Sequence, residues 1–250
     1  MPAVQTITLG AVAGLTIFLG LPIARLRAVG RQQLALLNAL AVGVLFFLFV
    51  DIMTHAADPV EEAMALHERA FWPLLALLGL GFGAGLLSLV YYGQRLLRPG
   101  GSTRRLVMLI AVGIGFHNFA EGLAIGNAAH VGAIALALTL VVGFGLHNAT
   151  EGFGIAAPLA GQSVSWGFLL LAGLIGGGPT FIGTIVGLRF TSEPVSVLFL
   201  ALAGGSILFV IVELLAASRK LAAPTWVGWG LTVGILAGFI TEFILASAGG

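Results

Sequence analysis

The sequence AVGIGFHNFAEGLAIG, residues 111–126, places a histidine, an asparagine and a glutamate inside an otherwise apolar stretch. The same three residue types recur at the same spacing thirty residues later, in HNATEGFGIAAPLAG, residues 147–161. Polar side chains are costly inside long apolar segments, so their repetition indicates a function for them rather than chance.

Each copy places its polar side chains on one side of a predicted helix. Residues four apart lie on the same face, so His117 projects beside Glu121 and His147 beside Glu151. Two antiparallel helices with these faces would bring their imidazoles and carboxylates into one small volume. The two asparagines that lie next to these faces, turned by about 100° around the helix axis, are Asn118 and Asn148.

The composition places these helices in a membrane. Hydrophobic residues make up 59% of the 250 residues and charged residues 8%, with a mean hydropathy of +1.10, whereas soluble domains carry about 25% charged residues. The apolar runs are about 20 residues long, which suits membrane-spanning helices rather than barrel strands. The net charge of +1 gives no reason to expect a nucleic-acid partner. The absence of cysteine excludes disulfides and thiolate metal sites.

Eight apolar segments follow one another with short links. They predict an all-α integral membrane protein with one transport domain over residues 1–250. If the spans alternate, nine of the eleven lysines and arginines fall on one side, and only Arg69 and Arg189 on the other. Positive residues favour the cytoplasmic side, so both termini are expected outside. The predicted spans cover residues 4–24, 33–55, 71–93, 106–128, 132–158, 165–188, 194–217 and 225–247.

A second, weaker repeat relates the second and seventh spans. Residues 41–51 and 203–213, AVGVLFFLFVD and AGGSILFVIVE, match in character at an offset of 162 residues, which pairs Asp51 with Glu213. These two spans run in opposite directions, as do the two spans that carry the histidine motifs. Both relations predict an inverted repeat, an arrangement that in secondary transporters places the substrate site near the bilayer midplane.

The intramembrane carboxylates predict a bound cation. A carboxylate at that depth is costly unless it is paired, and no lysine or arginine lies within the predicted spans. Imidazole together with carboxylate suits zinc, iron(II), manganese or cobalt, whereas magnesium and calcium prefer oxygen ligands alone. The asparagines leave room for a second, adjacent ion. The predicted metal ligands are His117, Asn118, Glu121, His147, Asn148 and Glu151.

Acidic residues at other depths suggest a path for the ion. Asp51 lies near the outer end of its span, and His55 lies one turn beyond it on the same face, which suggests an outer entrance. Glu213 lies near the inner end of its span and suggests an inner exit. The acidic link of residues 57–71 is interpreted as a solvated interfacial helix, and Glu242 is assigned no role.

Prolines and glycines predict where helices end and where they approach closely. Asp58 is expected to cap a new helix that has Pro59 at its first position. Pro158 is expected to break the fifth span and to free a backbone carbonyl about one turn earlier. Gly122 and Gly152, directly after the motif glutamates, allow neighbouring helices to approach closely.

The motif pair HNFAEGLAIG and HNATEGFGIAAPLAG resembles the signatures of the ZIP (Zrt-, Irt-like protein) metal transporters, and is most similar to the bacterial GufA-like branch. The resemblance covers the whole chain, because the eight spans with outside termini also match. It implies import of divalent transition metals, mainly zinc and often iron, manganese or cadmium, into the cytoplasm. It also implies a 3+2+3 helix arrangement, a homodimer and an elevator-like motion.

The resemblance also implies roles for individual residues. The motif histidines and glutamates resemble the primary metal site, and the asparagines, with the glutamates, resemble ligands of a second site beside it. Glu213 in VIVELL resembles an acidic position on the inner exit route. The family usually has proline before each motif glutamate, where this chain has Ala120 and Thr150. GufA-like members commonly have a glutamate before a proline in the sixth helix, where this chain has Gly178 before Pro179.

The sequence therefore predicts a transporter that imports zinc or a similar divalent cation, as substrate rather than cofactor, in the inner (plasma) membrane of a bacterium. Two alternatives stay open, a membrane-embedded zinc metalloenzyme and a metal-independent permease for protons or small solutes. The enzyme needs a free coordination position and a general base, and the His-Asn-x-x-Glu order lacks the second histidine of HExxH. Activity of the permease would not depend on metal.

Overall fold

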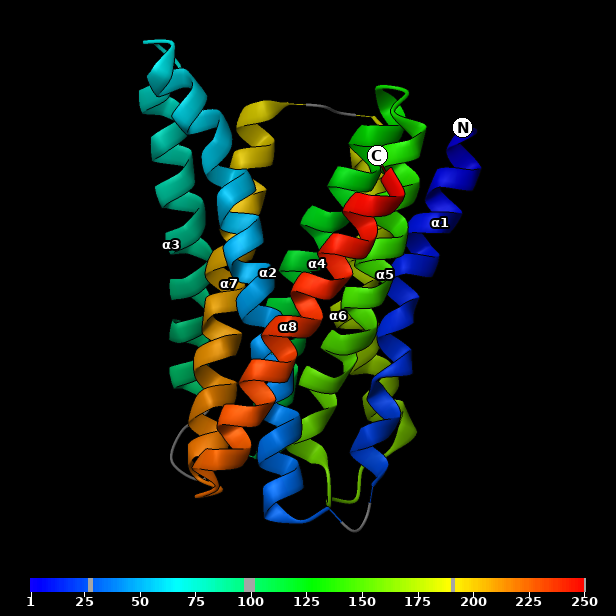
Figure 1. Cartoon of the computed structure of the whole chain (residues 1–250), viewed down its shortest axis with the longest axis vertical. Helices are drawn as coiled ribbons and strands as arrows, with labels where there is room; N and C mark the ends of the chain where they lie inside the picture. The colour runs from blue at the N-terminus through cyan, green and yellow to red at the C-terminus, as the bar shows by residue number, and fades with distance from the viewer. Residues whose placement is uncertain (27–28, 97–101, 190–191, 250) are drawn as a thin grey trace.

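Figure 1 shows a computed structural model of the chain, which describes residues 1–26, 29–96, 102–189 and 192–249. The structure is 88% helical, and the described residues contain no strand. The predicted all-α class is therefore confirmed.

In the described residues, eight helical segments are long and apolar enough to cross a membrane, which confirms the predicted number of spans. The first span, Ala3–Arg25, consists of α1 followed by two 3-10 turns, η1 and η2. The bounds are α1 Ala3–Leu15, η1 Thr16–Leu19, η2 Leu21–Arg25, α2 Arg31–Ala65, α3 Phe71–Leu96, α4 Thr103–His130, α5 Ile134–Ala156, η3 Ala157–Leu159, α6 Trp166–Gly187, α7 Glu193–Arg219 and α8 Pro224–Gly249.

The prediction of a new helix capped by Asp58 is wrong, because α2 continues through Pro59 and ends only at Ala65. The continuation buries apolar side chains: Val60 packs in a small cluster with Leu74 of α3. Burial of this surface offsets the hydrogen bond that a proline removes from a helix interior. The acidic segment is therefore a helical extension of α2 rather than a separate interfacial helix.

The predicted break at Pro158 is confirmed. α5 ends at Ala156, and the chain continues for one 3-10 turn, η3, that contains Pro158. α6 differs, since it contains Pro179 without ending there.

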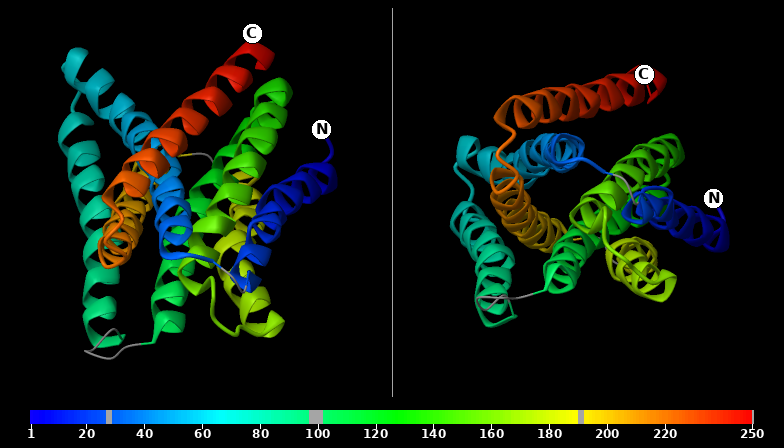
Figure 2. Two further views of the ribbon diagram at one scale, coloured as in Figure 1. Left: turned by 60° about the horizontal axis from the view of Figure 1, so that its bottom comes forward. Right: turned by 90° about the horizontal axis from the view of Figure 1, so that it is seen from below.

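The helices pack as two groups, which Figure 2 shows side by side. The most extensive contacts in one group, here called the α4 bundle, join α4 to α6, α4 to α5 and α1 to α6. The other group, the α2 bundle, is held by contacts of α2 with α8 and α7 and of α3 with α7. Contacts of α4 with α7 and of α5 with α2 and α8 connect the two bundles. α4 and α5, which carry the repeated motif, thus belong to one bundle and face the other.

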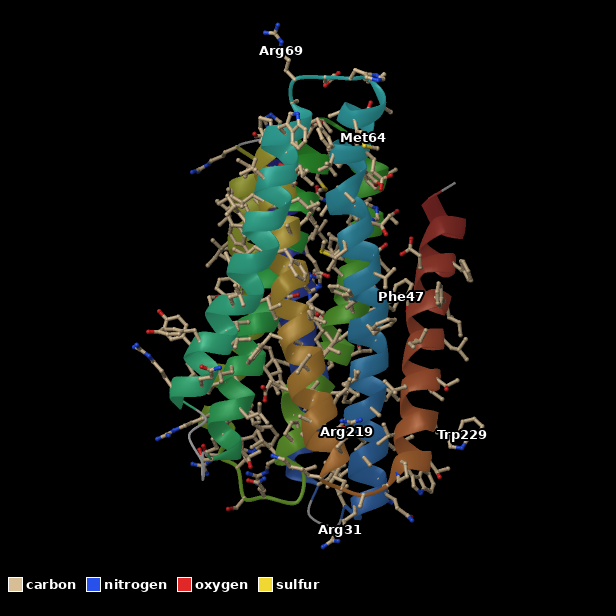
Figure 3. The ribbon with its side chains drawn as sticks, turned by 90° about the vertical axis from the view of Figure 1, so that its left-hand side faces the viewer. Arg31, Phe47, Met64, Arg69, Arg219 and Trp229 are labelled. Atoms are coloured by element: carbon tan, nitrogen blue, oxygen red, sulfur yellow. The ribbon has the colours of Figure 1, made fainter. Side chains whose placement is uncertain are left out.

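Labelled arginines mark the two ends of the molecule. In Figure 3, Arg31 and Arg219 lie at one end and Arg69 at the other, as the predicted charge bias requires. Both termini lie at the end that carries Arg69 (Figure 1). This end is called the outer end below, following the predicted orientation.

Candidate metal site

The two motif copies meet between α4 and α5. His117 Nε2 lies 3.0 Å from Glu121 Oε1 on its own helix and 3.4 Å from Glu151 Oε1 on the other helix. The exposed fractions of His117, Glu121, His147 and Glu151 are between 1% and 5%. The structure therefore brings the predicted carboxylates to one imidazole, in surroundings that exclude most water.

The motif asparagines are completely buried and tie the site to the neighbouring helices. Asn118 Nδ2 donates to the backbone oxygen of Gly176 in α6, at 2.9 Å. Asn148 Nδ2 donates to the backbone oxygen of Ala13 in α1, at 3.1 Å, and to Glu121 Oε2 at 3.4 Å. Because both amides use their nitrogens as donors, their side-chain oxygens are left as acceptors.

Glycines allow α4 and α5, which carry the motifs, to pack closely against neighbouring helices. A Cβ on Gly122 would collide with the backbone oxygen of Thr180 in α6, and one on Gly152 with that of Ile17 in η1. The predicted close approach after each motif glutamate is confirmed. At Gly178, by contrast, an added Cβ would have no neighbour within 4 Å among the described residues.

Many polar atoms at this site are buried without a hydrogen-bond partner. The short distances around His117 fall within the range of ion pairs, but they lack the geometry of hydrogen bonds. Each unsatisfied buried polar group costs about 1–3 kcal/mol. Within the described residues, the unpartnered atoms of the motifs are His117 Nδ1 and Nε2, His147 Nδ1 and Nε2, Asn118 Oδ1, Asn148 Oδ1, Glu121 Oε1, and Glu151 Oε1 and Oε2.

This donor set fits a transition-metal cation better than any other partner. Neutral imidazole nitrogens, carboxylates and amide oxygens all have lone pairs to give, and a divalent cation would satisfy several of them at once. The spacings of 3.0 and 3.4 Å are close to the edge, roughly 3.4 Å, of a tetrahedron with arms of about 2.1 Å. Nevertheless, no three His, Asp or Glu side chains in the described part of the chain are already arranged to hold a metal ion. Coordination therefore requires some side chains to turn.

A cavity of about 530 Å³ leads to the site from the outer end, and is called the outer cavity here. Its lining includes His117, Glu121 and His147 together with Asp51 and His55. His55 Nδ1 lies 3.5 Å from Asp51 Oδ1. The residues predicted to form an outer entrance thus share one cavity with three of the predicted metal ligands.

Glu242 of α8 also lines the outer cavity, although the sequence analysis gave it no role. The signal was present, since Glu242 is a carboxylate in the last apolar span, and such groups usually face the interior or a water-filled path. The sequence did not indicate that α8 packs beside α2 and α5.

Glu213 does not line the outer cavity but lies towards the opposite, inner end of the molecule. It lines a cavity of about 920 Å³, here called the inner cavity, together with Lys220. Along α4, Leu106 lines the inner cavity and His117 the outer one, with Ile110 and Ile114 completely buried between them. These isoleucines, with Leu45 of α2, belong to the main apolar core and are called the apolar barrier below.

Comparison with known proteins agrees with this geometry. The family model for ZIP Zinc transporters matches residues 97–246, a stretch that contains both motif helices and most of the helices that follow. A search of the curated proteins gave no match to the chain. Because the family model covers more than half of the sequence, this eight-span chain with its paired His-Asn-x-x-Glu helices belongs to the ZIP zinc transporter family.

Proposed function

We propose that this protein imports divalent transition-metal cations, zinc first, through the site between α4 and α5. The observation that carries the proposal is the buried meeting of His117 with Glu121 and Glu151, where unpartnered nitrogens and oxygens gather. Among the described residues that line the outer cavity there is no lysine or arginine. Membership of a metal-transporter family favours transport over the enzyme and the metal-independent permease.

The motif residues would serve as ligands of the transported ion. His117, Glu121, His147 and Glu151 provide two nitrogens and two carboxylates, which is enough for tetrahedral zinc. The oxygens of the motif asparagines would extend the donor set towards a second ion. Gly178 supplies no side chain, and α6 reaches the asparagine of α4 through the backbone oxygen of Gly176.

The ion would enter through the outer cavity, past Asp51 and His55, and leave through the inner cavity, past Glu213. Alternating access requires the α4 bundle to move against the α2 bundle. The glycine contacts of α4 with α6 and of α5 with η1 support motion of the site helices together with their neighbours. The apolar barrier would separate the ion from the inner cavity until that motion occurs.

An inverted repeat would account for the placement of both cavities. The offset that pairs Asp51 with Glu213 also pairs His55 with Ala217. The first member of each pair lines the outer cavity and the second lines the inner cavity. This supports a whole chain that acts as one transport domain, whereas the proposed location of both termini outside rests on the distribution of arginine and lysine. The homodimer and the GufA-like branch rest on the resemblance alone, and the inner membrane of a bacterium rests on the small size of the chain and its lack of a histidine-rich loop.

Zinc uptake into proteoliposomes tests the proposal. The native protein should take up zinc, and Glu121→Ala/Glu151→Ala should not, because each copy of the motif loses its carboxylate. The matched control removes two exposed glutamates, Glu68→Ala/Glu193→Ala, and should leave uptake near the native rate.

Glu121→Gln/Glu151→Gln keeps the shape of the side chains and should also lose uptake while folding normally. Equal zinc uptake by the native protein and by this variant would refute the path through the motif. Absence of uptake by the native protein, with iron(II), manganese, cobalt and cadmium tested in turn, would refute metal transport itself.

A further inference from the structure

Asn38 is a buried polar residue that the transport site does not use. It lies on α2, its exposed fraction is 2%, and its Oδ1 atom has no hydrogen-bond partner. It lines the inner cavity, as does Glu213 of α7. An unpartnered amide oxygen in an apolar wall is unfavourable, so its position beside a cavity that also contains a carboxylate calls for a ligand.

Asn38 and Glu213 approach the cavity from facing helices. A Cβ placed on Gly154 of α5 would lie 3.5 Å from Ala41 Cβ of α2 and 3.9 Å from Leu214 Cδ1 of α7, so Ala41 and Leu214 converge on one point. Asn38 lies one helical turn from Ala41, and Glu213 is next to Leu214 in the chain. Both oxygen-bearing side chains are therefore within about one turn of the same junction.

The amide oxygen is specific to the inner cavity. The offset of 162 residues that pairs Asp51 with Glu213 pairs Asn38 with Leu200. Leu200 lines the outer cavity, as does Asp51. At the two positions related by this offset, the outer cavity therefore has a carboxylate and an apolar side chain, whereas the inner cavity has a carboxylate and an amide.

We propose that Glu213 and Asn38 form a second, weaker cation site in the inner cavity, in which the carboxylate and the amide oxygen receive the ion after it leaves the site between α4 and α5. The assignment rests on the proposed function for its place in the path. Two oxygen ligands with no imidazole suit a hard divalent ion such as Mn²⁺ and bind Zn²⁺ less tightly than the histidine site, so the ion passes from strong to weak ligands.

Lys220 keeps this inner site weak. Its side chain also lines the inner cavity, and it follows Glu213 by seven residues, about two helical turns. A tethered positive charge beside the carboxylate competes with a divalent cation for the same oxygens. Lys220 therefore favours release over storage.

The absence of cysteine in the chain provides a direct test, because one introduced cysteine can carry a single label. A trifluoromethyl label on Leu87→Cys reports on the inner cavity, and the same label on Leu136→Cys reports on the outer cavity. In lipid nanodiscs, bound paramagnetic Mn²⁺ should broaden the fluorine signal of the Leu87 label. Asn38→Leu and Glu213→Gln should each abolish that broadening and leave the Leu136 label as in the native protein.

Variants of the same cavity serve as controls. Leu34→Ala changes the cavity wall without removing a ligand and should keep the broadening. Asn38→Asp should strengthen Mn²⁺ binding, which separates loss of a ligand from misfolding of Asn38→Leu. Lys220→Met should lower the half-saturating Mn²⁺ concentration by about threefold to tenfold, the scale expected when one partly screened charge is removed.

Broadening at Leu87 that survives both Asn38→Leu and Glu213→Gln would overturn the inner site, as would a Leu87 label that Mn²⁺ never broadens. These results concern binding and leave the uptake experiment untouched. Zinc uptake that depends on the motif glutamates, together with no Mn²⁺ in the inner cavity, would refute the inner site alone. Mn²⁺ bound there by a protein that transports no metal would refute the proposed function alone.

Discussion

His117 contacts carboxylate oxygens from both motif copies, so its ring is the point at which α4 and α5 share the site. His147 is just as deeply buried, but neither of its nitrogens has a hydrogen-bond partner. Imidazoles in such positions are unsatisfied unless an ion accepts their lone pairs. We therefore expect the histidines to matter more for metal affinity than for folding.

We expect His147→Ala to weaken zinc binding by at least about tenfold, since the loss of a residue that only hydrogen-bonds to a metal ligand already lowers metal affinity by about that factor. Removal of two unpartnered buried nitrogens should leave the melting temperature equal or higher. Calorimetric titration with zinc and a thermal melt measure both effects. His67→Ala, at an exposed turn, is the control and should change neither. A variant that loses stability in parallel with affinity would show that the ring is a packing residue.

At the scale of elements, α4 is fixed to α6 by backbone contact at a glycine, and α5 to η1 in the same way. Such contacts leave no room for a methyl group, and overpacking of a tight interface costs about 1–3 kcal/mol. The site helices and their neighbours thus form a rigid unit in which small residues, rather than large apolar ones, determine the spacing.

Gly122→Ala should therefore lower the thermal stability of the protein, because its Cβ meets the backbone of α6. Gly178→Ala is the matched control: it lies on α6 itself, its Cβ meets open space, and alanine favours helix by about 1 kcal/mol over glycine. The control should be neutral or stabilising. The comparison is made by thermal melts of both variants in one detergent. Equal melting temperatures for the two variants would contradict the tight packing of α4 on α6.

Helix ends were predictable from the sequence where local backbone preferences determine them. They were not predictable where tertiary packing determines them. α5 ends at Ala156, two residues before Pro158, as expected, because a proline disfavours the helical conformation in the residue before it and removes a backbone donor. Pro59 does not end α2, because the next residue, Val60, is buried against α3. This tertiary contact cannot be predicted from the local sequence. The duplicated histidine motif was predictable, since polar groups at that depth are costly wherever they occur.

At the scale of the whole molecule, the outer cavity reaches the proposed metal site and the inner cavity does not. Ile110 and Ile114 lie between them, completely buried. Neither cavity was predictable from sequence, because each is lined by helices far apart in the chain. For the same reason, the positions of Glu242 in the outer cavity and Asn38 in the inner cavity became apparent only from the structure.

Accessibility of single cysteines tests this arrangement and the orientation together. A membrane-impermeant maleimide added outside intact cells should label Ala124→Cys, which lines the outer cavity, and leave Ala217→Cys, which lines the inner cavity, unlabelled. Zinc should slow labelling at Ala124→Cys if the ion stabilises a closed site. Labelling of Ala217→Cys alone would reverse the orientation. Labelling of both positions from outside would contradict the barrier.

The apolar barrier also has a consequence for the energy supply of a cell. Protons move along continuous chains of hydrogen-bonded water, and narrow apolar constrictions tend to exclude water. The isoleucines of the apolar barrier would therefore prevent proton conduction between the two cavities. Under the proposed function, metal would cross in discrete loads, one per movement of the α4 bundle, and the protein would not conduct protons down the electrochemical gradient between these movements. A cell could then hold many copies of such a transporter at little cost to respiration, and could respond to metal shortage by making more of them.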